Sequence, residues 1–329
     1  MATDSPVTTP RPRVVISRCI EFGHCRWNGL VIASDAVKIM RPRIDFLPVC
    51  PEMHISLGCP REPVRLVDGG ERPRLLQPAT GRDCTEEMHR FAEKFLDSLG
   101  GEVDGFVLKS RSPSCGATDA KLYARSDSQM SRGKSQGLFA AAVLARFPHL
   151  PIEDEGRLRN FLIREHFLIR IHALARWRAV RPALRMDKLV DFHAANKLLL
   201  MAHNEVAMRR MGRLVANHAR RPAGGVFAAY ERLLHEALRE PARPEVCINV
   251  LEHAMGFFKR RASDLEKSFL IREIGLYRRG RAPLSVPVSL LRAWIVRFNE
   301  EYLARQTFFL PYPEELVSIT DSGTGRRLR

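Results

Sequence analysis

Residues 13–150 alternate short apolar runs, rich in β-branched residues, with stretches whose apolar positions recur every three or four residues. The first pattern predicts strands and the second predicts amphipathic helices. This order predicts an α/β N-terminal domain with a mostly parallel sheet. Prolines and glycines predict a long irregular stretch at residues 51–82. We expect strands at residues 14–17, 44–49 and 103–108, and helices at residues 33–40, 85–99 and 136–147.

The pattern changes at about residue 157, after which strand-like runs disappear and helical periodicity continues. Apolar residues from Leu158 to Ile169 mark one helix, and those from Leu189 to Val206 mark another. Prolines and glycines then separate six or seven helices, so the sequence predicts an all-α helical domain. The expected division is a disordered tail at residues 1–12, an α/β domain at 13–156, a helical domain at 157–317 and a flexible tail at 318–329.

The chain of 329 residues carries a net charge of +16, and most of the excess lies after residue 150. Such a balance predicts a polyanionic partner such as nucleic acid, although a generally arginine-rich surface would give the same charge. Residues 1–12 lack the apolar core of a signal peptide, and no apolar run is long enough to span a membrane. An odd number of cysteines, seven, favours reduced thiols. We therefore expect a cytoplasmic protein with no membrane partner.

Three cysteines each follow a predicted strand: Cys19, Cys50 and Cys115. Parallel strands place their carboxyl ends at one edge of a sheet, where ligand sites lie, so these thiols could converge. Three thiolates can hold an iron–sulfur cluster or a zinc ion, and they leave one position without a protein ligand. That open position would let the metal bind a substrate atom. The alternative is three unrelated buried or surface thiols.

Four segments carry a resemblance to known proteins. Residues 16–29, 50–66 and 108–116 resemble the three signature segments of TudS-type thiouracil desulfidases. Residues 157–316 resemble the helical domain that is often fused behind them. The two-domain arrangement is similar to the RudS group, which is implicated in removing sulfur from 4-thiouridine in tRNA.

The resemblance implies a [4Fe–4S] cluster that is held by Cys19, Cys50 and Cys115, with its fourth iron free. The thiocarbonyl sulfur of the substrate would bind that iron and water would attack C4, giving uridine and hydrosulfide without net redox change. The family motifs also imply that Glu52 and Ser112 manage the protons. Judged by residue type alone, Glu52 would more often be an ion-pair partner and Ser112 a turn former.

The sequence departs from the family pattern close to these residues. Relatives commonly have Asp where this chain has Asn28, so the resemblance assigns no acid role there. Cys25 and Cys59 are additional thiols near the predicted ligands. If either bound the cluster, the fourth iron would be closed to substrate.

The helical domain contributes the candidate RNA-binding residues. His193, Lys197 and Asn204 fall on one face of a predicted helix, which is either an RNA-facing strip or a buried network between helices. Basic pairs that include Lys259 and Arg260 would contact the phosphates of a folded RNA. The expected partner is tRNA that contains 4-thiouridine. The alternatives are the same chemistry on free thiouracil or thiouridine monophosphate, and a non-enzymatic RNA-binding protein with a structural metal site.

Overall fold

The computed structural model describes residues 10–317. The first nine residues of the predicted N-terminal tail, and all of the predicted C-terminal tail at 318–329, lie outside the described residues. The chain forms two compact units. The first comprises the residues up to Arg176 together with those from Pro313 onward, and the second comprises residues 177–312. The division falls inside helix α5 (Phe161–Val180).

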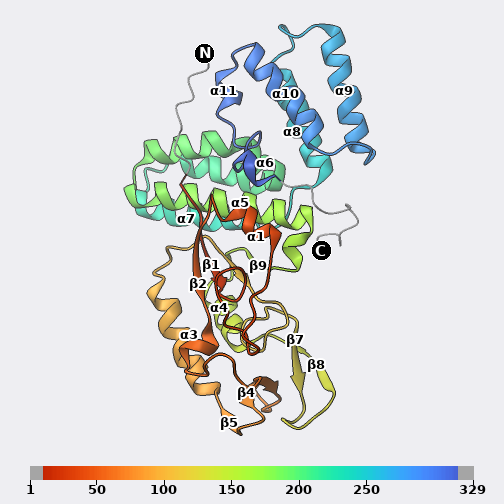
Figure 1. Cartoon of the computed structure of the whole chain (residues 1–329). Helices are drawn as coiled ribbons and strands as arrows, with labels where there is room; N and C mark the ends of the chain where they lie inside the picture. The colour runs from red at the N-terminus through yellow and green to blue at the C-terminus, as the bar shows by residue number, and fades with distance from the viewer. Residues whose placement is uncertain (1–9, 318–329) are drawn as a thin grey trace. The chain divides into compact units, whose positions relative to one another are not determined.

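A parallel sheet of four strands forms the centre of the first unit, in the order β2-β1-β6-β9. Val15 of β1 pairs with Leu47 of β2 on one side and with Phe106 of β6 on the other. The prediction of an α/β domain with a mostly parallel sheet is therefore confirmed (Figure 1). The strands are β1 (Arg13–Ser17), β2 (Asp45–Val49), β6 (Gly105–Leu108) and β9 (Ile152–Asp154).

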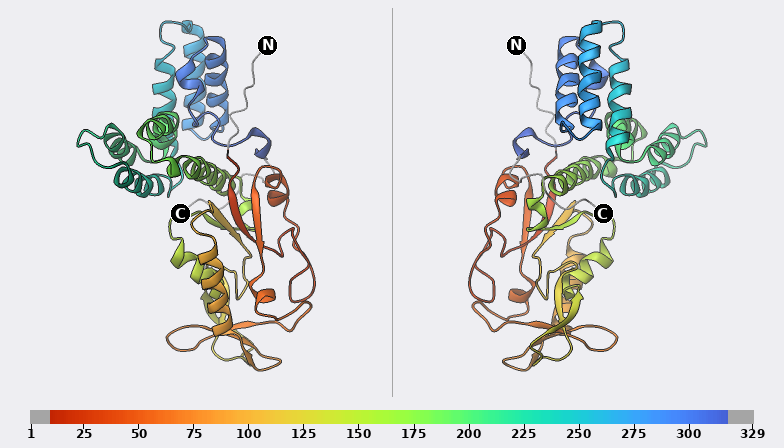
Figure 2. Two further views of the ribbon diagram at one scale, coloured as in Figure 1. Left: turned by 90° about the vertical axis from the view of Figure 1, so that its left-hand side faces the viewer. Right: turned by 90° about the vertical axis from the view of Figure 1, so that its right-hand side faces the viewer.

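Helices cover both faces of this sheet. Figure 2 shows α3 (Thr85–Ser98) and α4 (Leu138–Arg146) on one side of the strands and α1 (Asp35–Met40) on the other. The central strands β1 and β6 are buried on both faces, and because both faces are covered their sequences are apolar without alternation. The α3–α4 side forms one core cluster, in which Val15, Phe106 and Leu108 pack with Met88, Ala92, Phe139 and Val143.

A second sheet was not predicted. Its strands β3 and β4 and the start of β5 lie in the stretch 51–82, where the prediction of irregular structure is wrong, and its strands β7 and β8 lie between residues 120 and 135, where no strand was expected. Its order is β5-β4-β3-β7-β8, with both parallel and antiparallel pairs. The strands span only two to five residues each, and β8 is polar throughout. Such strands lack the alternation by which strands are detected. They are β3 (Arg65–Val67), β4 (Arg74–Gln77), β5 (Arg82–Asp83), β7 (Ala120–Tyr123) and β8 (Ser131–Ser135).

The second unit is helical throughout its described length, which confirms the predicted all-α domain. Trp177 packs against the rings of Phe192, Phe227 and Tyr230 and forms an aromatic core. None of the helices within residues 10–317 combines the length and the apolar character that a membrane span needs. The helices are α6 (Met186–Ala216), α7 (Ala223–Ala237), α8 (Pro244–Gly256), α9 (Asp264–Arg278), α10 (Ser285–Arg297) and α11 (Glu301–Ala304).

Candidate active site

The three predicted ligand cysteines follow three neighbouring parallel strands. Cys19 comes two residues after β1, Cys50 comes directly after β2, and Cys115 lies in the loop after β6. Because β1 pairs with both β2 and β6, all three thiols belong to the same edge of the sheet. Cys50 and Cys115 are buried, whereas Cys19 is partly exposed.

Cys25 joins this group of thiols. Its side chain interacts with those of both Cys19 and Cys50, and the Cys50 thiol donates to the Cys25 carbonyl oxygen at 3.8 Å. The hydrogen bond with Cys19, followed by burial, raises the pKa of Cys25 to about 11. The contact with Cys25 and burial likewise raise the pKa of Cys50. Burial is the main reason that the pKa of Cys115 is raised, and the nearby charges of Glu52 and Cys50 add to it.

The chemistry of this donor set fits an iron–sulfur cluster. Soft thiols gather at one sheet edge, and thiolates are the usual ligands of such clusters. Within residues 10–317, no three His, Cys, Asp or Glu side chains surround a point that would hold a metal ion.

Cys25 and Cys59 differ in their surroundings. Cys25 is buried between two of the predicted ligands. The Cys59 thiol instead donates to the carbonyl oxygens of His24 at 3.1 Å and Arg26 at 3.2 Å. Of the two extra thiols, Cys25 is thus the one placed to become a fourth ligand.

Glu52 lies in the first turn of the short helix α2 (Pro51–His54), directly after Cys50. Its Oε1 accepts a hydrogen bond from the Ser114 hydroxyl at 2.8 Å, and its Oε2 forms an ion pair with Arg61. The Arg61 side chain is only 3% exposed and also donates to the carbonyl oxygens of Cys25 at 2.9 Å and Gly58 at 2.8 Å. Burial alone would lower the pKa of Arg61, but the charge and the hydrogen bond of Glu52, with smaller contributions from Cys50 and Cys59, together raise it. Arg61 therefore fixes Glu52 to the segment that carries Cys25.

Ser112 shapes the loop that presents Cys115. Its Oγ accepts from the backbone N–H of Ser114 at 3.2 Å and of Cys115 at 3.0 Å. The hydroxyls of Ser112 and Ser17 both interact with the Cys115 sulfur. Ser112 is accordingly a turn former, as its residue type suggested, and also a neighbour of the thiol.

Gly137 holds this loop against α4. A Cβ at Gly137 would lie 2.5 Å from the Ser114 backbone, so only glycine allows the approach. The Gly137 N–H donates to the Gly116 carbonyl oxygen at 2.8 Å, and the Ala140 N–H donates to that of Ser114 at 3.0 Å. The loop is thereby attached to the start of a core helix.

A family model matches the part of the chain that contains this site. A model of the family described as 2-thiouracil desulfurase matches residues 14–155, which include every residue of the site above. The protein YbbK of Bacillus subtilis strain 168 is 30% identical over 111 residues, which cover 32% of this chain and 73% of YbbK. The chain belongs to the 2-thiouracil desulfurase family.

Further comparisons include a match outside the desulfurase region. A model described as a protein of unknown function, DUF1722, matches residues 197–313. YbgA of Escherichia coli strain K12 is 27% identical over 172 residues, 52% of this chain and 95% of YbgA, and both YbgA and YbbK are described as uncharacterized. A solved structure titled [4Fe-4S]-dependent thiouracil desulfidase TudS is 26% identical and covers 45% of this chain and 93% of its own, with a TM-score of 0.37. The predicted resemblance, a desulfidase domain fused to a helical domain, is confirmed.

The desulfurase site also contains residues that the sequence interpretation missed. Arg61, Ser114 and Ser17 contact Glu52 or Cys115, and Ser114 is fully buried. Arg61 and Ser114 both lie inside the motif segments, which was the only available signal. Their pairing with Glu52 spans 9 and 62 residues, respectively, so it could not be seen along the chain.

The predicted RNA-binding residues lie in the second unit, and the three that were expected on one helix face are not all on one continuous helix. Helix α6 is interrupted at Asn204, whose extended backbone (φ −156°) divides it, and whose side chain accepts from the Ala207 N–H at 3.0 Å. His193 is partly buried, and its Nδ1 lies 3.1 Å from the Tyr230 hydroxyl. Burial, with the charge of Lys197, lowers the pKa of His193 to about 4. Lys197, Lys259 and Arg260 are exposed.

Proposed function

We propose that the protein is a [4Fe–4S]-dependent desulfidase that converts 4-thiouridine in tRNA to uridine and releases sulfide. The observation that carries this proposal is the group of thiols at one sheet edge directly beside the carboxylate of Glu52. A carboxylate next to a site for a Lewis acid is the combination that hydrolysis of a carbon–sulfur bond requires.

Cys19, Cys50 and Cys115 would hold the cluster. When bound with one iron free of protein ligands, a cluster supplies a Lewis acid that polarises a thiocarbonyl and stabilises the sulfide leaving group. Glu52 would take a proton from the water that attacks C4, and that proton would later leave with the sulfur. The balance is C=S plus H₂O giving C=O plus H₂S, with no change in oxidation state.

The remaining residues of the site would keep Glu52 in position. Arg61 holds one carboxylate oxygen and Ser114 donates to the other. Ser112 and Ser17 would orient the Cys115 sulfur through their hydroxyls. These groups come from separate segments, so a substrate would meet a carboxylate whose rotamer is already fixed.

Two observations favour different substrates. The basic second unit supports a tRNA substrate, because a cationic surface attracts the RNA backbone and a thiolated base must leave its stack to be reached. The family description, 2-thiouracil desulfurase, instead supports a free thiobase. That second candidate uses the same site and leaves the charge of the helical unit without a role.

Sulfide release under anaerobic conditions distinguishes the candidates. Wild-type protein is incubated with tRNA that contains 4-thiouridine, with the same tRNA without sulfur, and with free 2-thiouracil. We expect a higher kcat/KM on the thiolated tRNA than on the base. Sulfide release from 2-thiouracil alone would show that the substrate is the free base. Release from neither substrate would contradict the proposed desulfidase activity.

A further inference from the structure

The second unit contains a cavity of about 640 Å³ between the C-terminal half of α6 and α7. Leu214, Ala229 and Leu233 contribute apolar lining to it. Four arginines also line it: Arg210 and Arg213 come from α6, Arg221 from the connecting loop and Arg232 from α7. Glu236 is the one acidic residue in the lining. We call this cavity the arginine groove.

The charges of the arginine groove are not neutralised within the chain. Arg210 pairs with Glu236 at 3.1 Å. The guanidinium groups of Arg213, Arg221 and Arg232 contact no carboxylate among residues 10–317. Three cations around one cavity repel each other, and an anion between them would relieve that repulsion.

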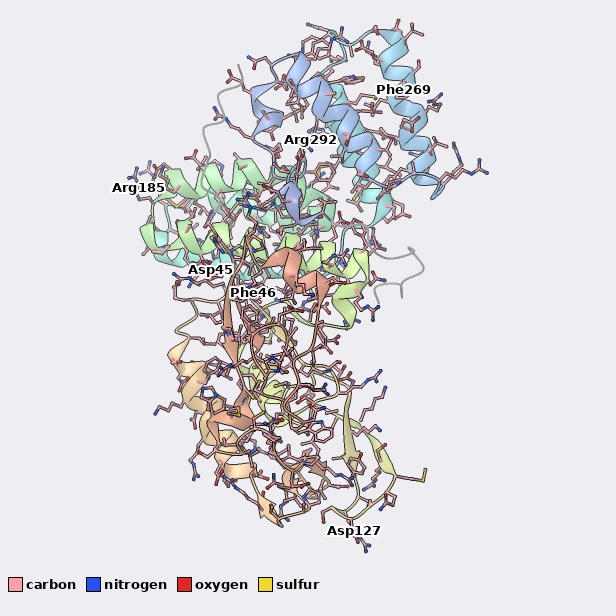
Figure 3. The ribbon with its side chains drawn as sticks, in the orientation of Figure 1. Asp45, Phe46, Asp127, Arg185, Phe269 and Arg292 are labelled. Atoms are coloured by element: carbon pink, nitrogen blue, oxygen red, sulfur yellow. The ribbon has the colours of Figure 1, made fainter. Side chains whose placement is uncertain are left out.

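Other arginines of the second unit are neutralised. Arg181 pairs with Glu231, Arg209 with Glu205 and Arg261 with Glu300. Arg185, which precedes α6 in Figure 3, pairs with Asp187. Several arginines of the unit are thus paired, whereas three of the four that line the groove have no carboxylate partner among residues 10–317.

The loop that closes the groove is fixed by its own hydrogen bonds. Asn217 ends α6 in the left-handed conformation (φ 41°), which asparagine tolerates better than most residues. Its side chain donates to the Arg221 carbonyl oxygen at 3.0 Å and accepts from the Arg221 N–H at 2.9 Å. Arg221 is therefore held at the cavity by a closed turn.

We propose that the arginine groove binds the phosphodiester backbone of RNA. The planar guanidinium groups would bind phosphate oxygens, and the apolar lining would pack against the sugar or the base. Guanidinium forms paired hydrogen bonds with phosphate, and folded RNA is recognised largely through its backbone. This inference rests on the proposed function for its biological meaning, because it names where the tRNA substrate is held. The groove nevertheless makes a binding claim that needs no desulfidation.

The test is a titration of the full-length protein with unmodified tRNA transcript at several salt concentrations. We compare the wild type with Arg213→Ala/Arg232→Ala. The matched control, Lys188→Ala/Arg305→Ala, removes two exposed cations of the same unit that lie outside the groove. We expect the groove variant to bind about tenfold more weakly and to lose about 1.5 from the slope of log affinity against log salt. The control should stay within about twofold.

A second variant separates loss of binding from misfolding. Glu236→Gln removes the groove's carboxylate, so we expect tighter RNA binding, and damage to the fold would not produce a gain. Equal weakening of RNA binding by the groove and control variants would overturn the proposal, because RNA would then be attracted by the net charge of the unit and not by the groove. Binding of polyglutamate in preference to RNA would overturn it as well.

Measuring sulfide release distinguishes failure of the groove proposal from failure of the proposed function. The groove variant should release sulfide from free 4-thiouridine at the wild-type rate and lose about tenfold in kcat/KM on thiolated tRNA. If the wild type released no sulfide yet bound RNA through the groove, the proposed function would fail and the groove would stand. If sulfide release from tRNA were unaffected in the variant, the groove would be excluded as the site that holds the substrate.

Discussion

One arginine of the first unit and three arginines of the second unit have opposite surroundings. In the first unit, Arg61 is buried and bonded to Glu52 and to two backbone carbonyls, so its charge is satisfied within the chain. In the second unit, Arg213, Arg221 and Arg232 line a cavity, and their side chains contact no carboxylate in the described part of the chain. A guanidinium that positions a catalytic group must be held by the protein, whereas one that awaits an anionic ligand must stay free. Under the proposed function, the first unit would carry the chemistry and the second unit would hold the substrate.

The largest effect is expected when a ligand cysteine of the first unit is removed. Cys115→Ser should lose the bound iron and all sulfide release, because a cluster held by two thiols is labile. Cys59→Ser is the matched control and should retain iron, because Cys59 bonds to backbone carbonyls. Iron content and visible absorption of protein purified without oxygen measure both. Iron retained in Cys115→Ser would remove Cys115 from the ligand set.

Replacing the carboxylate should leave the metal in place and stop the chemistry. Glu52→Gln keeps the shape of the side chain but cannot accept the proton of water, so kcat should fall about 10² to 10⁴-fold with unchanged iron content. Glu93→Gln, at an exposed position of α3, should have no effect. The kcat of Ser114→Ala should lie between those of Glu52→Gln and Glu93→Gln, because this variant removes one hydrogen bond to Glu52. An active Glu52→Gln enzyme would exclude Glu52 as the base.

Breaking the buried ion pair tests how much the contact between Arg61 and Glu52 stabilises the fold. Arg61→Ala leaves Glu52 buried without its partner, so the free energy of unfolding should fall by about 3 kcal/mol. The exposed pair of Arg74 and Asp83 offers the control, because Arg74→Ala should cost less than about 1 kcal/mol. Urea unfolding of the two variants measures the difference. Equal losses of unfolding free energy in Arg61→Ala and Arg74→Ala would mean that the buried pair stabilises the fold no more than the exposed one.

The smallest effect concerns pH and the second unit. His193 has a pKa of about 4 in the folded chain, mainly because it is buried, so the unfolded chain binds more protons between pH 6.5 and pH 4. Unfolding free energy should therefore fall by about 1 to 2 kcal/mol as the pH drops through this range. His193→Gln should reduce that pH dependence in a urea series. An unchanged slope would show that His193 does not remain neutral in the fold.

The sequence predicted those features that depend on local pattern. The strands β1, β2 and β6 were found because their buried runs are apolar, and the order of elements implied a parallel sheet that brings Cys19, Cys50 and Cys115 to one edge. The second sheet was missed because its strands are short and partly polar. No local pattern marks contacts such as Ser114 with Glu52, which join residues far apart in sequence.

The helical unit shows the same limit. A regular helix was assumed from His193 to Asn204, but the break at Asn204 changes which residues share a face. Val206, one of the apolar residues that marked the predicted helix, is 69% exposed. Basic pairs were recognised as phosphate contacts, yet the arginine groove combines α6, α7 and their loop. Which cations lack a carboxylate partner is a property of the folded chain alone.

Iron analysis of the wild-type protein purified without oxygen, followed by reaction with thiolated tRNA, would show whether a cluster is bound and whether it is needed for desulfidation. We expect about four irons and four sulfides per chain, and release of one further sulfide for each 4-thiouridine that becomes uridine. Protein that binds no iron, or that releases sulfide equally well without it, would contradict a cluster held by Cys19, Cys50 and Cys115.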